Sequence, residues 1–498
     1  MNKVTVNGWP LWKFWDMKEY SCVRHSSCIG QASALPHSII DTPNDLTAVR
    51  GAKPECILAL VAAVCLAGCA SVHEKTLRDK YSETSSNTYE VADAKAAFNA
   101  HTNVDGYLRY AFVHNSMLHA AFNRWQAAIE RIPQARSLDD PSLSFEYFIE
   151  QRTELYQVSL SQTFPALGKV ELRDKVAEAE AEAAMHEFEE KRVILYDRVA
   201  KAFYEYYYLS RAITVTGESL RLLSDVDDVL VARYKAGLAP FSELIKVQVE
   251  KDRLTNELAT MRDERGPKST MLQSLLNLPA GEALPWPEFT TSGQSIIDEA
   301  VLAGMIQDLN PGPKAADAMI TAAEERKKLA RRSFLPDFTL GANWMVMPGV
   351  DGKGNESDVS LMAGITLPLW WGKYHSEMRE AAAMAKSATN ERDDKRNMLR
   401  ADLSMSVFKF RDAERKTALF KAALIPKATQ ALEVARQEFS SGQADFMTLI
   451  DAHRTLLELK LQDERAAVDR EIAMAEIGCC IGKYGAIDAS GRMTVEKR

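Results

Sequence analysis

The residues with the clearest chemical potential are a cysteine and the small residues before it. The run Leu66-Ala67-Gly68-Cys69 ends an apolar segment of about 13 residues that begins at Cys56 and follows Arg50 and Lys53. The small side chains admit a signal peptidase, and the Cys69 thiolate can accept a diacylglycerol, as in the bacterial lipobox. We therefore expect a lipid anchor at Cys69. A buried helix that happens to contain these four residues is the alternative.

The segment that precedes the expected signal peptide is unusual. Residues 1–48 carry Trp9, Trp12 and Trp15 without a clear periodicity. A translation start near Val49 would leave a signal peptide of conventional length. We therefore expect residues 1–68 to be an N-terminal extension and a signal peptide that are removed, and residues 69–88 to be a lipidated linker.

The rest of the chain shows no residue set with the spacing of a catalytic or metal site. It contains no Gly-x-Ser-x-Gly, HExxH or phosphate-loop pattern. Four of the seven cysteines precede Cys69, and the adjacent Cys479 and Cys480 cannot easily bridge each other, so no disulfide framework or zinc site is expected. His453, Cys479 and Cys480 are interpreted as incidental core or surface residues. A net charge of -8 gives no basic footprint for nucleic acid. We expect no enzyme activity, no cofactor and no nucleic-acid partner.

The elements that position the remaining residues occur in two copies, as an internal repeat of roughly 200 residues. Three blocks recur in the same order. Asn115, Ala120-Ala121 and Pro141 align with Asn310, Ala315-Ala316 and Pro336. Residues 164–169 align with 367–373, and residues 233–244 align with 438–449. Each half reads as a helix, two strands, a very long helix, a tight turn and a return helix.

The strands show the clearest periodicity. Leu143, Phe145 and Tyr147 alternate with polar residues, and so do Phe338, Leu340 and Trp344 in the second half. Segments of about ten residues that are apolar on one side and polar on the other suit a transmembrane barrel with a wet lumen. Two half-buried soluble hairpins fit the strand pattern equally well. No apolar stretch of about 18 residues occurs, so a membrane crossing would have to use strands.

The helices that follow the strands are too long for a globular core. From Lys169 to Tyr234 there is no proline, and from Lys373 to Phe439 there is only Pro426. About 65 residues in one helix extend about 100 Å. Small and apolar positions at heptad-like spacing indicate laterally packed coiled coils.

Four strands cannot close a sheet by themselves. Open edges in a bilayer leave backbone groups unpaired, so other chains must complete a barrel. A dimer would supply eight strands and a trimer twelve. Side chains would fill an eight-stranded barrel, so an open pore favours at least three protomers.

This order of elements resembles the TolC-like outer-membrane factors of tripartite efflux systems. The specific marks are Tyr234-Lys235-Ala236-Gly237, Phe439-Ser440-Ser441-Gly442, Phe334-Leu335-Pro336-Asp337 and the helix start Asn310-Pro311. The resemblance covers residues 89–483, and the lipobox resembles the lipoprotein subset of the family. It implies an α+β membrane protein, in which a long antiparallel α-helical coiled-coil barrel joins a homotrimeric twelve-stranded transmembrane β-barrel, to which each chain gives four strands.

The resemblance sets the expected boundaries. The repeats span 89–285 and 286–483, with strands at about 141–164 and 337–369, long helices at about 169–235 and 374–439, return helices at about 240–278 and 444–482, and a tail at 484–498. It also implies a channel of the cell outer membrane with a long periplasmic extension. A periplasmic adaptor, an inner-membrane pump and outer-membrane lipid are the implied partners of a tripartite efflux or type I secretion system.

The resemblance places the functional residues at the helix tips. Asp451 matches a family aspartate of the periplasmic entrance, where three copies would form a carboxylate ring; a solvated surface acid is the alternative. The family often has a second acid one turn earlier, where this chain has Thr448. Arg233 and Tyr234 lie where the family holds its closed tip together, although Arg233 also fits an exposed helix C-terminal charge.

The remaining candidates are turn, docking and interface residues. Turns between antiparallel helices require positive φ, which favours glycine. We expect turns and adaptor docking at the residues Gly237, Leu238, Ala239, Gly442, Ala444 and Phe446. Ordinary coil contacts are the alternative for the nonglycine members. Trp370 and Trp371 are expected at the membrane interface, where indoles favour the headgroup layer, or in a packed corner.

Two other functions compete. A structural or adhesive coiled-coil lipoprotein would explain the long helices, but it predicts no repeated strand hairpins. A soluble periplasmic enzyme would need a convergent nucleophile, base and acid, and no motif supplies them. The transported substrate cannot be read from the sequence.

Overall fold

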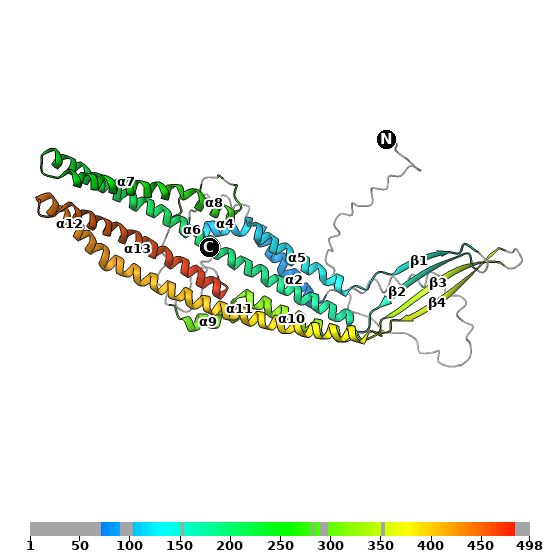
Figure 1. Ribbon diagram of the computed structural model, residues 1–498. Coiled ribbons are helices and arrows are strands. Elements are labelled where there is room, and N and C mark those ends of the chain that lie inside the picture. Colours follow the sequence, from blue (N-terminus) through cyan, green and yellow to red (C-terminus); the bar gives the residue numbers. More distant parts are fainter. Residues whose placement is uncertain are drawn as a thin grey trace, which may run out of the picture. The chain divides into compact units, whose positions relative to one another are not determined.

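The computed structural model describes residues 71–89, 103–150, 154–279, 281, 284–288, 297–349 and 354–483 (Figure 1). The chain divides into the units Met1–Ala67 and Gly68–Arg498, and all the described residues lie in the second. Cys69, the signal segment and the tail 484–498 lie outside the described residues. Among the described helices, none has the length and apolar character needed to cross a bilayer.

The predicted duplication is confirmed in the element order. The first repeat contains α4 (Val104–His114), α5 (Ser116–Arg136), β1 (Ser142–Tyr147), β2 (Tyr156–Phe164), α6 (Lys169–Lys235), α7 (Phe241–Asp263) and α8 (Arg265–Leu276). The second contains α9 (Glu299–Leu309), α10 (Pro311–Arg332), β3 (Phe338–Pro348), β4 (Asn355–Ile365), α11 (Trp371–Leu419), a π-helical turn η2 (Phe420–Leu424), α12 (Ile425–Ser441) and α13 (Phe446–Ile481). α6 has 67 residues, and its rise of 1.5 Å per residue gives a length of about 100 Å.

The segment expected to be a linker at 69–88 is instead mostly helical. α2 (Val72–Tyr89) packs on α5 and α6, with Leu77 2% exposed and the Tyr81 ring stacked on Phe122 at 4.5 Å. Glu74 and Arg78 of this mostly polar helix form ion pairs with α5, and its apolar contact is limited to Leu77 and Tyr81, one helical turn apart. That contact is too small to give a visible sequence period.

Two expected helices are interrupted. The first return helix breaks at Glu264 into α7 and α8, because Pro267 in the first turn of α8 cannot donate to the preceding turn. The second long helix contains the π-turn η2 immediately before Pro426, which begins α12. A π-turn absorbs the hydrogen bond that proline removes, so the chain continues in nearly the same direction.

Asparagines at equivalent positions of the two repeats join the end of each return helix to the start of another helix. Asn115 caps α5 with its side-chain oxygen and donates from Nδ2 to the Leu275 carbonyl at the end of α8, at 2.8 Å. Asn310 caps α10 in the same way and donates to the Cys480 carbonyl at the end of α13, also at 2.8 Å. Each return helix therefore ends against the start of the helix that precedes the strands. The asparagine satisfies groups that both helix ends leave unpaired.

The four strands form one antiparallel sheet in the order β1-β2-β3-β4. Its register puts Phe145, Val158, Trp344 and Val359 in one row across all four strands, with their polar neighbours Ser144, Ser159, Asn343 and Ser360 in the next row. Successive rows point to opposite faces, so one face is apolar and the other polar. All β1 and β4 residues are exposed.

Candidate functional site

Both helical hairpins turn at a glycine, as predicted. Gly237 has φ +74° and Gly442 has φ +77°. In each turn the residue after the glycine donates its amide to a carbonyl five residues back, Leu238 to Arg233 and Gln443 to Glu438, both at 2.8 Å. This is the Schellman arrangement, in which the left-handed residue closes the helix and releases the chain for the return.

Arg233 joins the two tips. Its Nη1 donates to the Phe439 carbonyl oxygen at 2.6 Å, and its guanidinium lies 4.7 Å from the centre of the Phe439 ring. Phe439 lies in the last turn of α12, so the contact runs from the first hairpin to the second. The role expected of Arg233 in holding a closed tip therefore has a geometric basis. The neighbouring Tyr234 packs on Phe241 within its own hairpin instead.

The two tips differ in what they expose. At the first tip, Leu238 is 69% exposed and Phe241 54%. At the second, Phe446 is 1% exposed and packs against Phe439 in the core. Ala239 and Ala444 are half-buried at equivalent places. The side chain of Phe446 is therefore a core residue in this chain and does not present a surface for docking.

Asp451 is exposed on α13, two turns beyond the N-cap Asp445. Its Oδ1 lies 3.9 Å from Nη1 of Arg454, which makes a closer pair with Glu250. The Asp445 carboxylate accepts from the Thr448 amide at 2.9 Å and holds the cap. These amide and hydroxyl bonds from Thr448 keep the pKa of Asp445 below its usual range.

A ladder of ionic contacts between the hairpins was missed in the sequence. Arg454 of α13 donates to Glu250 of α7 at 2.6 Å, and Glu250 is 1% exposed. Higher up, Arg211 of α6 holds Glu464 of α13 with two nitrogens at 2.7 and 2.9 Å. The sequence did contain a signal for this contact. Glu250 is a charged residue on the same heptad face of α7 as the apolar Val247 and Leu254.

Trp370 lies just before α11 and Trp371 is its first residue, at the predicted change from strand to helix. Trp370 caps the start of α11 and is 76% exposed, and Trp371 is 65% exposed. Trp371 and Tyr374 both contact the Phe334 ring, at 6.1 and 5.2 Å between centres. The corner is therefore packed on one side and presents two indoles on the other.

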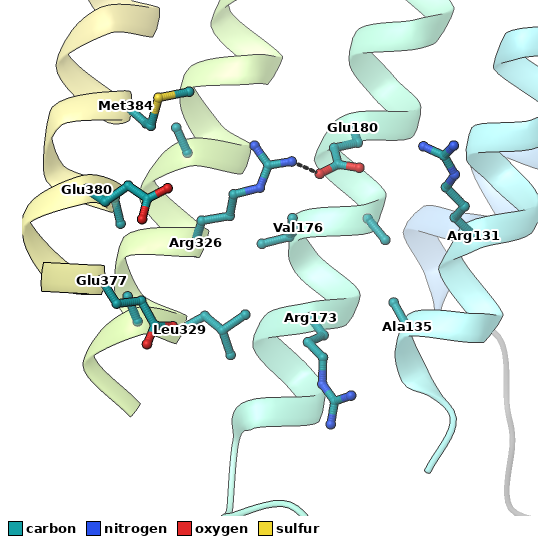
Figure 2. Close-up of a pocket in the computed structure, with 14 residues that line it drawn as sticks. Arg131, Ala135, Arg173, Val176, Glu180, Arg326, Leu329, Glu377, Glu380 and Met384 are labelled. Carbon is teal, nitrogen blue, oxygen red and sulfur yellow. Dashed lines mark hydrogen bonds and ion pairs between the residues drawn. The ribbon is translucent and has the colours of Figure 1, made fainter. Parts of the chain in front are cut away.

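A cavity of about 630 Å³ lies on the wall formed by α5, α6, α10 and α11 (Figure 2). Arg131, Arg173, Glu377 and Glu380 are among the residues that line it, and Arg326 of α10 reaches Glu180 of α6 and pairs with it. Glu178 and Glu182, which face α2, are each two residues from Glu180 on α6. Two residues turn a helix by about 200°, so the cavity is on the face opposite α2. The cavity is lined by alanines and by equal numbers of arginines and glutamates, so its lining carries no net charge of either sign.

The geometry defines a class: a duplicated protein of long helical hairpins that carries an open, two-faced β-sheet. Residues 302–482, nearly the whole second repeat, match the family model described as outer membrane efflux protein. The chain therefore carries an outer membrane efflux protein domain. The predicted resemblance to TolC-like outer-membrane efflux proteins is confirmed.

Similar proteins agree with this assignment. An uncharacterized protein of Haemophilus influenzae is 26% identical over 211 residues, covering 41% of this chain and 46% of the relative. Toxin and drug export protein A of Aggregatibacter actinomycetemcomitans is 24% identical over 247 residues, covering 48% and 53%. The matches thus span about half the length of these curated relatives.

A solved structure covers more of the chain. The outer membrane protein VceC of Vibrio cholerae has a TM-score of 0.66 at 18% identity, over 76% of this chain and 96% of VceC. At this identity the comparison establishes the fold. Both repeats, including the first, which lies outside residues 302–482, therefore belong to one known architecture.

Proposed function

We propose that this protein is the outer-membrane channel of a tripartite efflux or type I secretion system, a passive conduit from periplasm to exterior that is gated at the helix tips. The observation that carries the proposal is the sheet. Its apolar row is exposed, with Phe145 65% and Val359 64% accessible, and β1 and β4 are its edge strands among the described residues. Lipid would cover that face, and further strands would satisfy those edges.

The helices supply a second surface that a single chain leaves bare. Met384, Met398, Met405 and Leu419 of α11 recur at multiples of seven residues and are 49–59% exposed. At the opposite edge of the helical layer, Ile245 and Val249 of α7 are also exposed. Exposed apolar residues at both edges of the layer give neighbouring chains a surface on either side, as a head-to-tail ring requires. We propose a homotrimer, because three copies give twelve strands.

The anchor belongs to the same proposal. The Ser71 hydroxyl bonds to Glu178, and Glu74 pairs with Arg136 at 3.1 Å, so the start of α2 is fixed on α5 and α6. A lipid on Cys69 would be attached two residues from this fixed point. The proposed lipid would then add a second tether for the outer-membrane channel.

The partners follow from the tip and from the relatives. The name toxin and drug export protein A describes export by that relative. We propose that a periplasmic adaptor docks at the tips, with its apolar contacts at Leu238, Ala239 and Phe241, and that an inner-membrane pump supplies the substrate. Asp451 would line the entrance in three copies and attract cations.

Single-channel recording in planar bilayers tests the function. The purified protein is expected to give stable conductance steps, and Asp451→Asn is expected to lower the ratio of cation to anion permeability. Glu433→Gln, at an exposed site on α12, is the matched control and should leave that ratio unchanged. A protein that inserts without conducting would reject the channel. An unchanged ratio in Asp451→Asn would remove Asp451 from the entrance.

A further inference from the structure

One buried histidine in the joint between the hairpins has no role in the function proposed above. His453 lies on α13, is 6% exposed and contacts Ser219 of α6. Its Nε2 is 3.0 Å from the Ser219 hydroxyl and 3.2 Å from the Ser219 carbonyl oxygen. A carbonyl oxygen only accepts, so Nε2 carries the proton of the neutral ring.

The other ring nitrogen is left bare. Among the described residues, Nδ1 is buried and has no hydrogen-bond partner. Protonation would place a second N–H there that has no acceptor among the described residues. Burial lowers the pKa of His453, and the Ser219 carbonyl offsets part of that effect.

The charges around the ring do not compensate a proton. Glu250 of α7 favours the cation, but its carboxylate is already paired with Arg454. Arg454 and Lys460 of α13 oppose it. Glu218 and Arg221 of α6 line an adjoining cavity of about 310 Å³ and carry opposite charges. The closed joint therefore holds a neutral imidazole between α6 and α13.

We propose that His453 is a proton-sensitive positioning residue of the gate, whose protonation separates the second hairpin from the first. Opening the joint exposes the ring to water, where it binds a proton readily, whereas the closed joint excludes the proton. Acid therefore favours the open joint. The inference about the gate rests on the proposed channel function, while the proton linkage of the joint does not.

The size and the sign follow from linkage. With an ordinary pKa of about 6.5 in the open joint and a lower value in the closed joint, the closed joint keeps its full stability above about pH 6.5 and loses it below. Between pH 7.5 and 5.5 the equilibrium shifts toward opening by at most about tenfold per chain, which is the limit in which the closed joint binds no proton.

Hydrogen exchange of the full-length protein tests the linkage without requiring transport. Exchange at the imidazole C2 position, followed by mass spectrometry, gives the pKa of His453, which should lie below 6.5. Amide exchange in the segments around Ser219 and His453, corrected for the intrinsic effect of pH, should be faster at pH 5.5 than at pH 7.5, by at most about tenfold. An ordinary or raised pKa, or no corrected difference, would overturn the proposal.

Two variants make the test specific. His453→Gln keeps a donor for the Ser219 carbonyl but cannot titrate, so its corrected exchange should not change between the two pH values. His375→Gln, at an exposed site on α11, should keep the wild-type response. A His453→Gln protein that still responds to pH like the wild type would assign the effect to another group.

Bilayer recordings then separate the two proposals. The open probability at pH 5.5 should exceed that at pH 7.5 in the wild type and not in His453→Gln. Conductance without any pH response would reject the gating role of His453 and leave the channel standing. A pH-dependent joint in a protein that never conducts would reject the channel and leave the proton linkage standing.

Discussion

Arg233 and Glu250 are single side chains that each hold two hairpins together. Arg233 reaches the Phe439 carbonyl, and Glu250 is buried against Arg454. The sequence placed Arg233 at the tip, because the turn pattern around Gly237 is local. It did not give either partner, because each lies about 200 residues away and depends on how the repeats pack.

The first residue-scale prediction concerns Arg233→Ala. The variant loses a charged hydrogen bond and a cation–π contact, which together stabilise the half-buried tip contact by about 2 kcal/mol. Local opening around Phe439 should therefore increase about 30-fold, as measured by amide hydrogen exchange. Lys235→Ala, on the exposed side of the same turn, is the control. Equal exchange in the two variants would show that Arg233 does not join the tips.

The second residue-scale prediction concerns the buried carboxylate of Glu250. The hydrogen bond from Arg454 holds its pKa below the usual range. The stabilisation is therefore present above about pH 4.5 and is lost as pH falls through the lower folded value. Because Arg454 is partly exposed, Glu250→Gln should cost about 1–2 kcal/mol at pH 7 and less at pH 4.

Thermal unfolding followed by circular dichroism at both pH values measures this difference. Asp252→Asn, at an exposed site on the same helix, should leave the midpoint nearly unchanged at pH 7. A Glu250→Gln penalty that is the same at pH 4 and pH 7 would contradict the charge-based explanation.

At the scale of elements, long-range order follows from local rules where the signals are strong. The glycine turns, the 67-residue helix and the alternating strands are all read from short windows of sequence. The docking of α2, the break at Glu264 and the π-turn at Phe420–Leu424 were not predicted. The docking of α2 depends on a few side-chain contacts. The break and the π-turn each lie beside a proline, and whether a proline breaks a helix depends on how the neighbouring helices pack.

The element-scale prediction compares two glycines. Gly442 has positive φ with open space around it, so Gly442→Ala pays only backbone strain, about 1 kcal/mol. Gly217 lies inside α6, also with open space, so Gly217→Ala should stabilise its helix by about 1 kcal/mol. Amide exchange near each site should change in opposite directions. Changes of the same sign would contradict the assigned backbone conformations.

At the scale of the whole molecule, the central claim is that one chain is an incomplete unit. Among the described residues β1 and β4 are the edge strands of the sheet, and α11 exposes a heptad stripe with the neighbouring Phe408 62% accessible. The sequence predicted the need for other copies, since four strands cannot close. It did not predict which helix forms the contact between chains. Many positions in a long coil have heptad spacing, and only the structure shows which of them stay exposed in a single chain.

Native mass spectrometry of the protein extracted from outer membranes in mild detergent tests this claim most directly. We expect an assembly with three times the mass of the mature chain. Phe408→Glu, which places a charge within the exposed apolar surface of α11, should shift the population toward single chains, while Glu433→Gln should not. A stable wild-type monomer that retains its folded sheet in the membrane extract would show that one chain is a complete unit.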